Sequence, residues 1–440
     1  MCGILFSTVP HDLTGMIRAR GPNHYGRYES QDAVLEAAVL ALREPATEQP
    51  IIVGTKALAY NGEIYGTDGN DSVVFFDRLQ ASVRDAVQIE GEFAFIYWDN
   101  DSIWFGRDRL GRRSLMYSLE NGLLVTSVGG AIECNAGVLY QYSLSSKNFS
   151  EIDLRRTYTV SRSIGWTPNE QLLQVLKQAV LERTVCPSNL SKVAVLFSGG
   201  LDCTIIARLM DMVLPQEFEI DLLNVAFENR RANTMWETPD RILGRRSFSE
   251  LQALSSRRFN LEEINVPYEE ALESHAIVKQ LMWPQKTVMD LSIAMAFYFA
   301  AKGGHSTTPI LFSGLGADEL FAGYSRHLGA YTSNKLAEEL ELDFGRVDTR
   351  NLGRDDRVSA CWGKEIRYPY LSEAVVTHAL QLPLDAKTDG KTTKIALRHV
   401  AKALGLEEVC HEKKRAIQFG ARSAKMDPGS GKAKGHNLID

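Results

Sequence analysis

The stretch VAVLFSGGLDCTIIARLM (193–210) places the strongest constraint on how this chain can fold. An apolar run that predicts a buried strand leads directly into the turn SGGLD (198–202), and a helical pattern follows at once. Two successive glycines let the backbone approach a ligand closely, and free N–H groups at a helix start favour an anion. The Ser198 hydroxyl adds a donor, and the Asp202 carboxylate suits a Mg²⁺ ion that bridges phosphates. We expect a phosphate-binding turn here, with incidental glycines in an ordinary turn as the alternative.

A second stretch, PILFSGLGADELFAGY (309–324), has the same order of strand, Ser-Gly turn and helix. Its acidic residue Asp318 opens the helix, as Asp202 does in the first stretch. Two such loops on neighbouring strand ends would hold one pyrophosphate and its metal from two sides. The G-x-x-x-x-G-K-[ST] phosphate loop does not occur in the sequence.

From about residue 166 the sequence alternates between strand and helix patterns, which predicts a parallel sheet with helices on both faces. Thr167, Pro168 and Glu170 have the spacing of a helix start with a capping box. The basic segment 227–248 shows little periodicity, so we expect a solvated loop there, with a substrate-covering flap as the alternative. The expected strands are 192–197, 221–227, 262–266 and 309–313, and the expected helices include 203–210, 248–259 and 290–302.

The part before residue 150 has the pattern of strands joined by turns. In EFAFIYWDNDSIWFGRD (92–108), two aromatic and β-branched runs flank the turn Asp-Asn-Asp, which predicts a hairpin. The sequence pattern changes at 150–166, where we place the domain boundary. The segment 421–440 has few large apolar residues, and we expect it to be a disordered tail.

The chain begins MCGILF, with a cysteine directly behind the initiator methionine. If the methionine is removed, Cys2 carries a thiol of pKa about 8.5 and an α-amine of pKa about 7.7. That amine can accept the thiol's proton near neutral pH, which is one way to activate a weak nucleophile. The alternative is that Cys2 is a small buried hydrophobic residue at the start of a strand.

Composition limits the classes of function. The net charge of −6 gives no basic field for nucleic acid, and no apolar run is long enough to cross a membrane. We see no secretory signal, and the six cysteines are scattered without a C-x-x-C pair. These features favour a cytoplasmic protein with reduced thiols, and they leave its oligomeric state open.

The two halves together resemble a known family. The turn SGGLD resembles the S-G-G-x-D-S loop of the ATP pyrophosphatases, and with MCGI, RGPN (20–23), NGEIY (61–65) and EIRYPYL (365–371) the chain resembles the glutamine-hydrolysing asparagine synthetases up to about Gly420. The resemblance implies an α+β N-terminal-nucleophile glutaminase domain of stacked antiparallel sheets at 2–160. It implies an α/β ATP-pyrophosphatase domain with a parallel sheet at 166–420.

The resemblance also implies substrates and roles. L-Glutamine would be hydrolysed at Cys2, and its ammonia would pass through an internal tunnel to L-aspartate activated by ATP and Mg²⁺. Asn61 and Gly62 would stabilise the oxyanion, and Arg43, Glu63 and Asp71 would bind glutamine. Residues implied for ATP and pyrophosphate are Leu196, Ser198, Gly199, Gly200, Asp202, Val225, Ser313, Gly314 and Lys414 (or its neighbour Lys413). The metal ligands would be Asp202 and Asp318.

The sequence departs from the family pattern at informative places. Leu315 stands where the asparagine-forming members have a glutamate, S-G-E-G, and leucine cannot accept a proton. Cys203 replaces the closing serine of the first loop, and a thiol is a poorer donor than a hydroxyl. Three hypotheses follow: a glutamine-dependent asparagine synthetase or close amidotransferase, an ATP-binding regulator that lost one reaction, and an ATP-dependent ligase on another carboxylate, as in the β-lactam synthetases.

Overall fold

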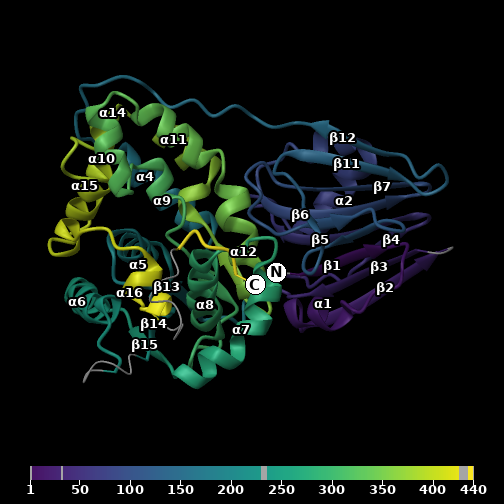
Figure 1. Cartoon of the computed structure of the whole chain (residues 1–440), viewed down its shortest axis with the longest axis horizontal. Helices are drawn as coiled ribbons and strands as arrows, with labels where there is room; N and C mark the ends of the chain where they lie inside the picture. The colour runs from purple at the N-terminus through teal and green to yellow at the C-terminus, as the bar shows by residue number, and fades with distance from the viewer. Residues whose placement is uncertain (1, 31–32, 229–234, 426–434, 440) are drawn as a thin grey trace.

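The computed structural model describes residues 2–30, 33–228, 235–425 and 435–439, which fold into two halves lying side by side (Figure 1). The N-terminal half contains two six-stranded antiparallel sheets, and the C-terminal half contains one five-stranded parallel sheet with helices around it. The fold class expected from the sequence is therefore confirmed.

Two antiparallel sheets form a sandwich in the N-terminal half. The first has the order β10 (Ile132–Glu133), β8 (Met116–Ser118), β9 (Leu124–Thr126), β1 (Gly3–Ser7), β3 (Ala33–Val39) and β2 (His24–Ser30). The second has the order β12 (Phe149–Asp153), β11 (Val138–Ser143), β7 (Ser102–Arg107), β6 (Glu92–Asp99), β5 (Lys56–Glu63) and β4 (Ile51–Val53). The expected hairpin is formed by β6 and β7, which pair in antiparallel register.

Alternating side chains of both sheets meet in the core of the sandwich. Ile4 and Phe6 of β1 pack against Ile96 and Trp98 of β6, and the rings of Phe6 and Trp98 lie 5.2 Å apart, edge to face. Because successive side chains of a strand point to opposite faces of the sheet, the residues between these core residues lie on the outer face. Around the sandwich lie α1 (Thr14–Arg20), α2 (Asp71–Ala81) and α3 (Val83–Ala86), of which α2 and α3 cover the outer face of the second sheet.

The parallel sheet of the C-terminal half has the order β15 (Phe259–Val266), β14 (Glu219–Phe227), β13 (Lys192–Leu196), β16 (Ile310–Phe312) and β17 (Glu365–Arg367). The chain adds β14 and β15 on one side of β13 and then β16 and β17 on its other side, so the strand order reverses between β13 and β16. Open parallel sheets bind ligands at the carboxyl ends of the strands at such a reversal. Both Ser-Gly turns follow these two strands, so the topology places them side by side.

Helices cover both faces of the parallel sheet, as right-handed crossovers require. Helices α5 (Leu201–Val213) and α6 (Pro239–Leu254) follow β13 and β14, whereas α7 (Tyr268–Met282) and α8 (Val288–Lys302) lead back to β16 (Figure 1). The remaining helices are α4 (Gln171–Glu182), α9 (Ala317–Leu320), α10 (Ser325–Thr332), α11 (Leu336–Phe344), α12 (Gly353–Ala360), α13 (Glu373–Gln381), α14 (Leu384–Lys387), α15 (Ile395–Ala403) and α16 (Ile417–Gly420). Within the described ranges, no helix combines the length and apolarity needed to span a bilayer.

Two local expectations were wrong. Helix α4 begins at Gln171 with Glu170 as N-cap and without a side-chain cap, so the capping box at Thr167 does not form. The expected loop 227–248 contains most of α6, whose N-cap Thr238 accepts a hydrogen bond from the Arg241 nitrogen, while 229–234 lie outside the described residues.

The expected tail 421–440 also packs on the domain where it is described. Ala421 is buried, and the Ser423 hydroxyl donates to the carbonyl of Ser292 in α8. Residues 435–439 pair with the segment before α8, where the nitrogen of Ile439 donates to the Lys286 carbonyl at 2.9 Å. Residues 426–434 and 440 lie outside the described part of the chain.

Candidate active sites

Cys2 and Asn61 come together because the two sheets of the sandwich pack on each other. Cys2 directly precedes β1, and Asn61 belongs to β5 of the other sheet. The main-chain nitrogen of Cys2 donates a hydrogen bond to Oδ1 of Asn61, with an N···O distance of 2.7 Å. Both residues are buried, and burial raises the pKa of the Cys2 thiol. A thiol in this environment needs a base to become a thiolate.

Asn61 retains an unused donor. Its Nδ2 is buried and has no hydrogen-bond partner among the described residues, a situation that native structures rarely leave without a functional reason. The next residue, Gly62, has φ +153°, and a Cβ there would lie 2.2 Å from the carbonyl oxygen of Glu92. Position 62 therefore requires glycine, and the pair has the free amide donor that an oxyanion site needs.

The three residues predicted to bind glutamine form one buried cluster. Nε of Arg43 donates to Oε2 of Glu63 at 2.7 Å, and Oδ1 of Asp71 lies 3.9 Å from the same nitrogen. Asp71 also accepts a hydrogen bond from the main chain of Ile64 at 2.9 Å. Burial, with the negative charge of Asp71, raises the pKa of Glu63 to about 8. Arg43 is thus held by Glu63, so binding a ligand carboxylate through Arg43 requires this ion pair to rearrange.

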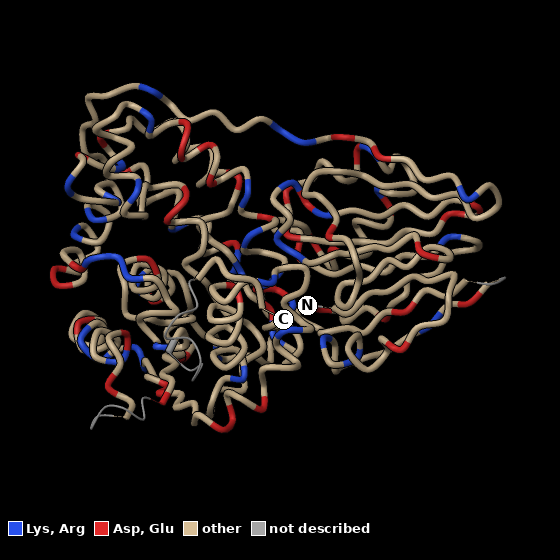
Figure 2. The backbone as a smooth tube through the Cα atoms, viewed as in Figure 1, with Lys and Arg blue, Asp and Glu red and all other residues tan. Residues whose placement is uncertain are grey.

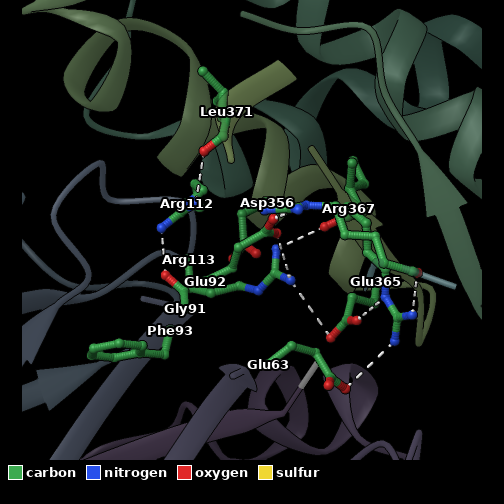
Figure 3. A network of polar contacts seen from close by, with 12 residues as sticks. Glu63, Gly91, Glu92, Phe93, Arg112, Arg113, Asp356, Glu365, Arg367 and Leu371 are labelled. Atoms are coloured by element: carbon green, nitrogen blue, oxygen red, sulfur yellow. Dashed lines mark hydrogen bonds and ion pairs between the residues drawn. The ribbon is translucent and has the colours of Figure 1, made fainter. Parts of the chain in front are cut away.

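Glu63 is also joined to the other half of the molecule through Arg367 (Figure 3). Nη2 of Arg367 lies 3.5 Å from Glu63 Oε1, and its Nε donates to Glu365 at 2.8 Å. The Arg367 carbonyl accepts a hydrogen bond from the nitrogen of Ser313, at the start of the second Ser-Gly turn, at 3.0 Å. One residue therefore touches both candidate sites.

More buried ion pairs cross the same boundary, where charged residues of both halves meet (Figure 2). Arg20 Nη2 lies 2.7 Å from Asp356, and Glu92 lies 2.8 Å from Arg183. Arg113, in the same half as Glu92, lies 3.3 Å from it and completes this cluster. All five of these side chains are almost completely buried. The polar boundary fixes the orientation of the two halves.

A cavity of about 480 Å³ opens at the reversal point of the parallel sheet. Its wall includes most of the residues predicted to bind ATP or metal: Leu196, Ser198, Gly200, Asp202, Val225, Ser313, Gly314, Asp318 and Lys414. Gly199 is not part of the wall. It has φ +79°, and a Cβ there would lie 2.5 Å from Gly244 in α6, so its role here is close packing of loop and helix.

The two Ser-Gly turns have matching internal geometry. The Ser198 hydroxyl accepts a hydrogen bond from the nitrogen of Gly200 at 3.3 Å, and the Ser313 hydroxyl accepts one from Leu315 at 3.2 Å. A Cβ on Gly314 would lie 2.9 Å from the Cβ of Asp202, so the second turn packs directly on the first. The geometry brings both Ser-Gly turns, which the sequence predicts to bind phosphate, to one wall of the cavity.

Two carboxylates and two lysines lie between the turns. Nζ of Lys394 is 2.6 Å from both Asp202 Oδ2 and Asp318 Oδ1, and Nζ of Lys414 is 3.4 Å from Asp318 Oδ2. Burial opposes ionisation of Asp318, but Lys394 and Lys414 outweigh it and lower its pKa. Burial raises the pKa of Asp202, whose Oδ1 has no hydrogen-bond partner in the described structure. This group offers cations and carboxylates to a phosphate chain and its metal.

Sequence reasoning missed several residues of these sites. Lys394 lies 192 positions from Asp202, and no motif that we recognised marks it. A local signal exists only in the structure, where Lys394 has the unusual φ of +56° for a non-glycine residue. Asp240 also lines the cavity, within the segment expected to be a loop.

Leu315 lies where the sequence departs from the resembled family. Its side chain is half-buried and lines the cavity beside Gly314. The asparagine-forming pattern would place a carboxylate at this position. The cavity wall instead presents an apolar group there.

Comparisons with known proteins agree with this architecture. The model of the asparagine synthase family matches residues 171–340 and 330–434, and the model of a glutamine amidotransferase domain matches 67–133. An asparagine synthetase domain-containing protein of Saccharomyces cerevisiae is 39% identical over 96% of this chain and 90% of its own length. Asparagine synthetase domain-containing protein 1 of Gallus gallus is 31% identical over 96% of this chain and 95% of its own.

A more distant relative is the glutamine-hydrolysing asparagine synthetase B of Escherichia coli, which is 24% identical over 94% of this chain and 80% of its own length. The stacked antiparallel sheets and the parallel sheet with its paired turns are consistent with the asparagine synthase-like glutamine amidotransferases. The chain belongs to the asparagine synthase family. The resemblance expected from the sequence is thereby confirmed.

Proposed function

We propose that this chain is a cytoplasmic, glutamine-dependent ligase that consumes ATP and forms an amide, L-asparagine from L-aspartate or the amide of another carboxylate. The observation that carries the proposal is that one chain brings Cys2 against Asn61 in one half and two Ser-Gly turns with their aspartates in the other. Neither arrangement alone accounts for an amidotransferase.

In the first half-reaction, the Cys2 sulfur attacks the side-chain amide carbon of glutamine. Once Met1 is removed, the α-amine of Cys2 takes the thiol proton and returns it to the leaving ammonia. The tetrahedral oxyanion accepts hydrogen bonds from the free Nδ2 of Asn61 and from Gly62. Water then cleaves the thioester to give glutamate. Glu63 and Asp71 supply carboxyl oxygens that accept hydrogen bonds from the α-ammonium group of glutamine.

In the second half-reaction, an oxygen of the acceptor carboxylate attacks the α-phosphorus of ATP, and the bond to the pyrophosphate oxygen breaks. The two Ser-Gly turns hold the departing phosphates, and Lys394 and Lys414 balance their charge. Leu196 and Val225 contact the nucleoside. Ammonia then attacks the acyl carbon, and AMP leaves with the former carboxylate oxygen.

A Mg²⁺ ion fits the donor set of this cavity. Asp202 and Asp318 supply hard oxygen ligands from the two turns, and Oδ1 of Asp202 is buried without a hydrogen bond. Within the described residues no group of three or more His, Cys, Asp or Glu side chains is arranged for a metal, so the phosphates would complete the coordination. When bound, the ion would neutralise phosphate charge. Lys394 shares both carboxylates and must then shift toward the phosphates.

The direct test is the reaction itself. Purified protein, shown by mass spectrometry to begin at Cys2, is incubated with ATP, Mg²⁺, glutamine and aspartate, and pyrophosphate, glutamate and asparagine are measured. We expect pyrophosphate and asparagine in equal amounts. Cys2→Ala should lose glutamate formation but keep synthesis from ammonia. Cys134→Ala, the same change in the same core, is the control. Loss of both activities in Cys2→Ala alone would contradict the two-site mechanism.

Leu315 favours a second candidate, an asparagine synthetase-like protein in which glutamine hydrolysis persists while the synthetase site has lost or changed its reaction. The cavity wall offers an apolar side chain where a proton acceptor stands in the asparagine-forming pattern. Glutamate formation without pyrophosphate or asparagine would support this candidate. Leu315→Glu should then raise the asparagine yield if the missing carboxylate is the cause, and an unchanged yield would point to a different acceptor.

A further inference from the structure

Asp240 is a buried carboxyl group at one end of the cavity. It lies in the first turn of α6, its residue is 4% exposed, and it forms part of the cavity wall. Its side chain makes no hydrogen bond or ion pair with any described residue, and Arg415 is the charged group that influences it. A buried carboxyl without a partner costs free energy unless a ligand supplies one.

Asn224 fixes Asp240 beside the predicted nucleoside contacts. The Nδ2 group of Asn224 donates to the Asp240 carbonyl at 2.9 Å and to the Phe197 carbonyl, also at 2.9 Å. Asn224 precedes Val225 at the end of β14, and Phe197 follows Leu196 at the end of β13. The carboxyl group therefore lies at the nucleoside end of the cavity.

Main-chain nitrogens beside the carboxyl group donate to other acceptors. Gly420 packs on it so closely that a Cβ there would lie 2.0 Å from Oδ2, and the Gly420 nitrogen already donates to the Ala416 carbonyl at 3.0 Å. The Arg241 nitrogen donates to the Thr238 hydroxyl at 3.2 Å. The cavity also has apolar walls at this end, among them Leu243. The carboxyl oxygens are thus available to a ligand in the cavity.

We propose that Asp240 hydrogen-bonds the amine-bearing edge of adenine and thereby lets the cavity recognise the exocyclic amine of the base. The inference rests on the proposed ATP site and deepens it by naming a specificity-determining residue. Leu196 and Val225 can contact the base only through their main-chain polar groups, and Asp240 would add a side-chain contact to the amine.

The chemistry of a buried carboxyl suits adenine. Adenine presents an acceptor at N1 beside a donor at its exocyclic amine. A neutral carboxyl offers one donor and one acceptor side by side and can pair with both groups, and an ionised one can still accept a hydrogen bond from the amine. Burial raises the pKa of Asp240 to about 7, so the neutral form is well populated near neutral pH.

The test compares nucleotides that differ in the amine. Binding of ATP and of purine riboside triphosphate, which lacks the amine, is measured by calorimetry on the full chain with Mg²⁺. We expect wild type to bind ATP about 10- to 100-fold more tightly than purine riboside triphosphate. Asp240→Ala should bind the two equally, and Asp240→Asn, which keeps one donor and one acceptor, should retain the preference. Asp221→Asn, a buried residue on β14 outside the cavity wall, is the control.

Three results would overturn the proposal, and they differ in what else they affect. Equal binding of ATP and purine riboside triphosphate by wild type refutes it without any variant. An undiminished preference in Asp240→Ala assigns discrimination to other groups and leaves the ATP site intact. Wild type that binds no nucleotide refutes the ATP site together with this inference.

Discussion

Replacing Glu92 by glutamine tests whether buried charge holds the two halves together. Glu92 is 0% exposed, its Oε1 accepts a hydrogen bond from Arg183 Nε at 2.8 Å, and its Oε2 lies 3.3 Å from Arg113 Nη2. Arg183 belongs to the C-terminal half, and Glu92 and Arg113 to the N-terminal half (Figure 3 shows Glu92 and Arg113). Glutamine has nearly the same shape, keeps one acceptor for Arg183 and removes the charge.

The magnitude follows from these contacts. Removing one member of a buried ion pair costs about 3–5 kcal/mol, because the remaining charge is left uncompensated. Glutamine can keep the hydrogen bond to Arg183, worth roughly 1 kcal/mol, and Arg113 keeps Glu365 at 3.7 Å. We therefore expect Glu92→Gln to lower the free energy of unfolding by about 3 kcal/mol. The assay is denaturant unfolding at pH 7. Glu90→Gln, an exposed glutamate two positions earlier, should stay within about 0.5 kcal/mol of wild type.

The pH dependence gives an independent check. Burial opposes ionisation of Glu92, but Arg183 and Arg113 outweigh it and lower its pKa below the ordinary value of 4.5. A lowered folded-state pKa adds stability above the unfolded-state pKa, and this stability is lost as the pH falls through the folded-state value. The difference between wild type and Glu92→Gln should therefore shrink below about pH 4.5. A variant as stable as wild type at pH 7, or a difference that grows in acid, would refute the reasoning.

Three further predictions concern the candidate sites. Asn61→Ala should slow glutamine hydrolysis by about 10²–10³-fold while Asn135→Ala, outside the site, leaves it unchanged; equal rates would remove Asn61 from the oxyanion site. Asp202→Asn should stop pyrophosphate release in a coupled assay without changing thioester formation, and unaltered release would exclude Asp202 as a metal ligand. Lys394→Met should weaken inhibition by added pyrophosphate, whereas Lys402→Met on the same helix should not; an unaffected inhibition constant would contradict the phosphate contact.

The turn SGGLD and the alternation around it could be predicted because their signals are local. Two glycines between an apolar run and a helical run indicate a tight turn between a strand and a helix. The alternation of strands and helices around this turn then predicts the parallel sheet. The same holds for the hairpin of β6 and β7, whose turn contains Asn100 with φ 53°. Patterns within about 15 residues were therefore sufficient for the class of fold.

Features that depend on distant partners could not be predicted in this way. The ion pair of Arg43 with Glu63 and the position of Lys394 between two aspartates arise from packing of separate elements. The capping box at Thr167 failed because the chain there is held by tertiary contacts: the main chain of Trp166 donates to Asp385 at 3.0 Å. The hydrogen bond to Asp385, more than 200 residues away, thus outweighs the local preference for a helix start at Thr167.

Arg367 has a consequence for how such a protein can change over evolutionary time. Its side chain reaches Glu63 of the N-terminal half, and its carbonyl accepts a hydrogen bond from Ser313 in its own half. A glutaminase half taken from another protein would bring its own groups to this boundary and leave Arg367 and its neighbours without matching charges. The two halves are therefore not exchangeable modules but a matched pair, and a change on one side of the boundary selects for a compensating change on the other.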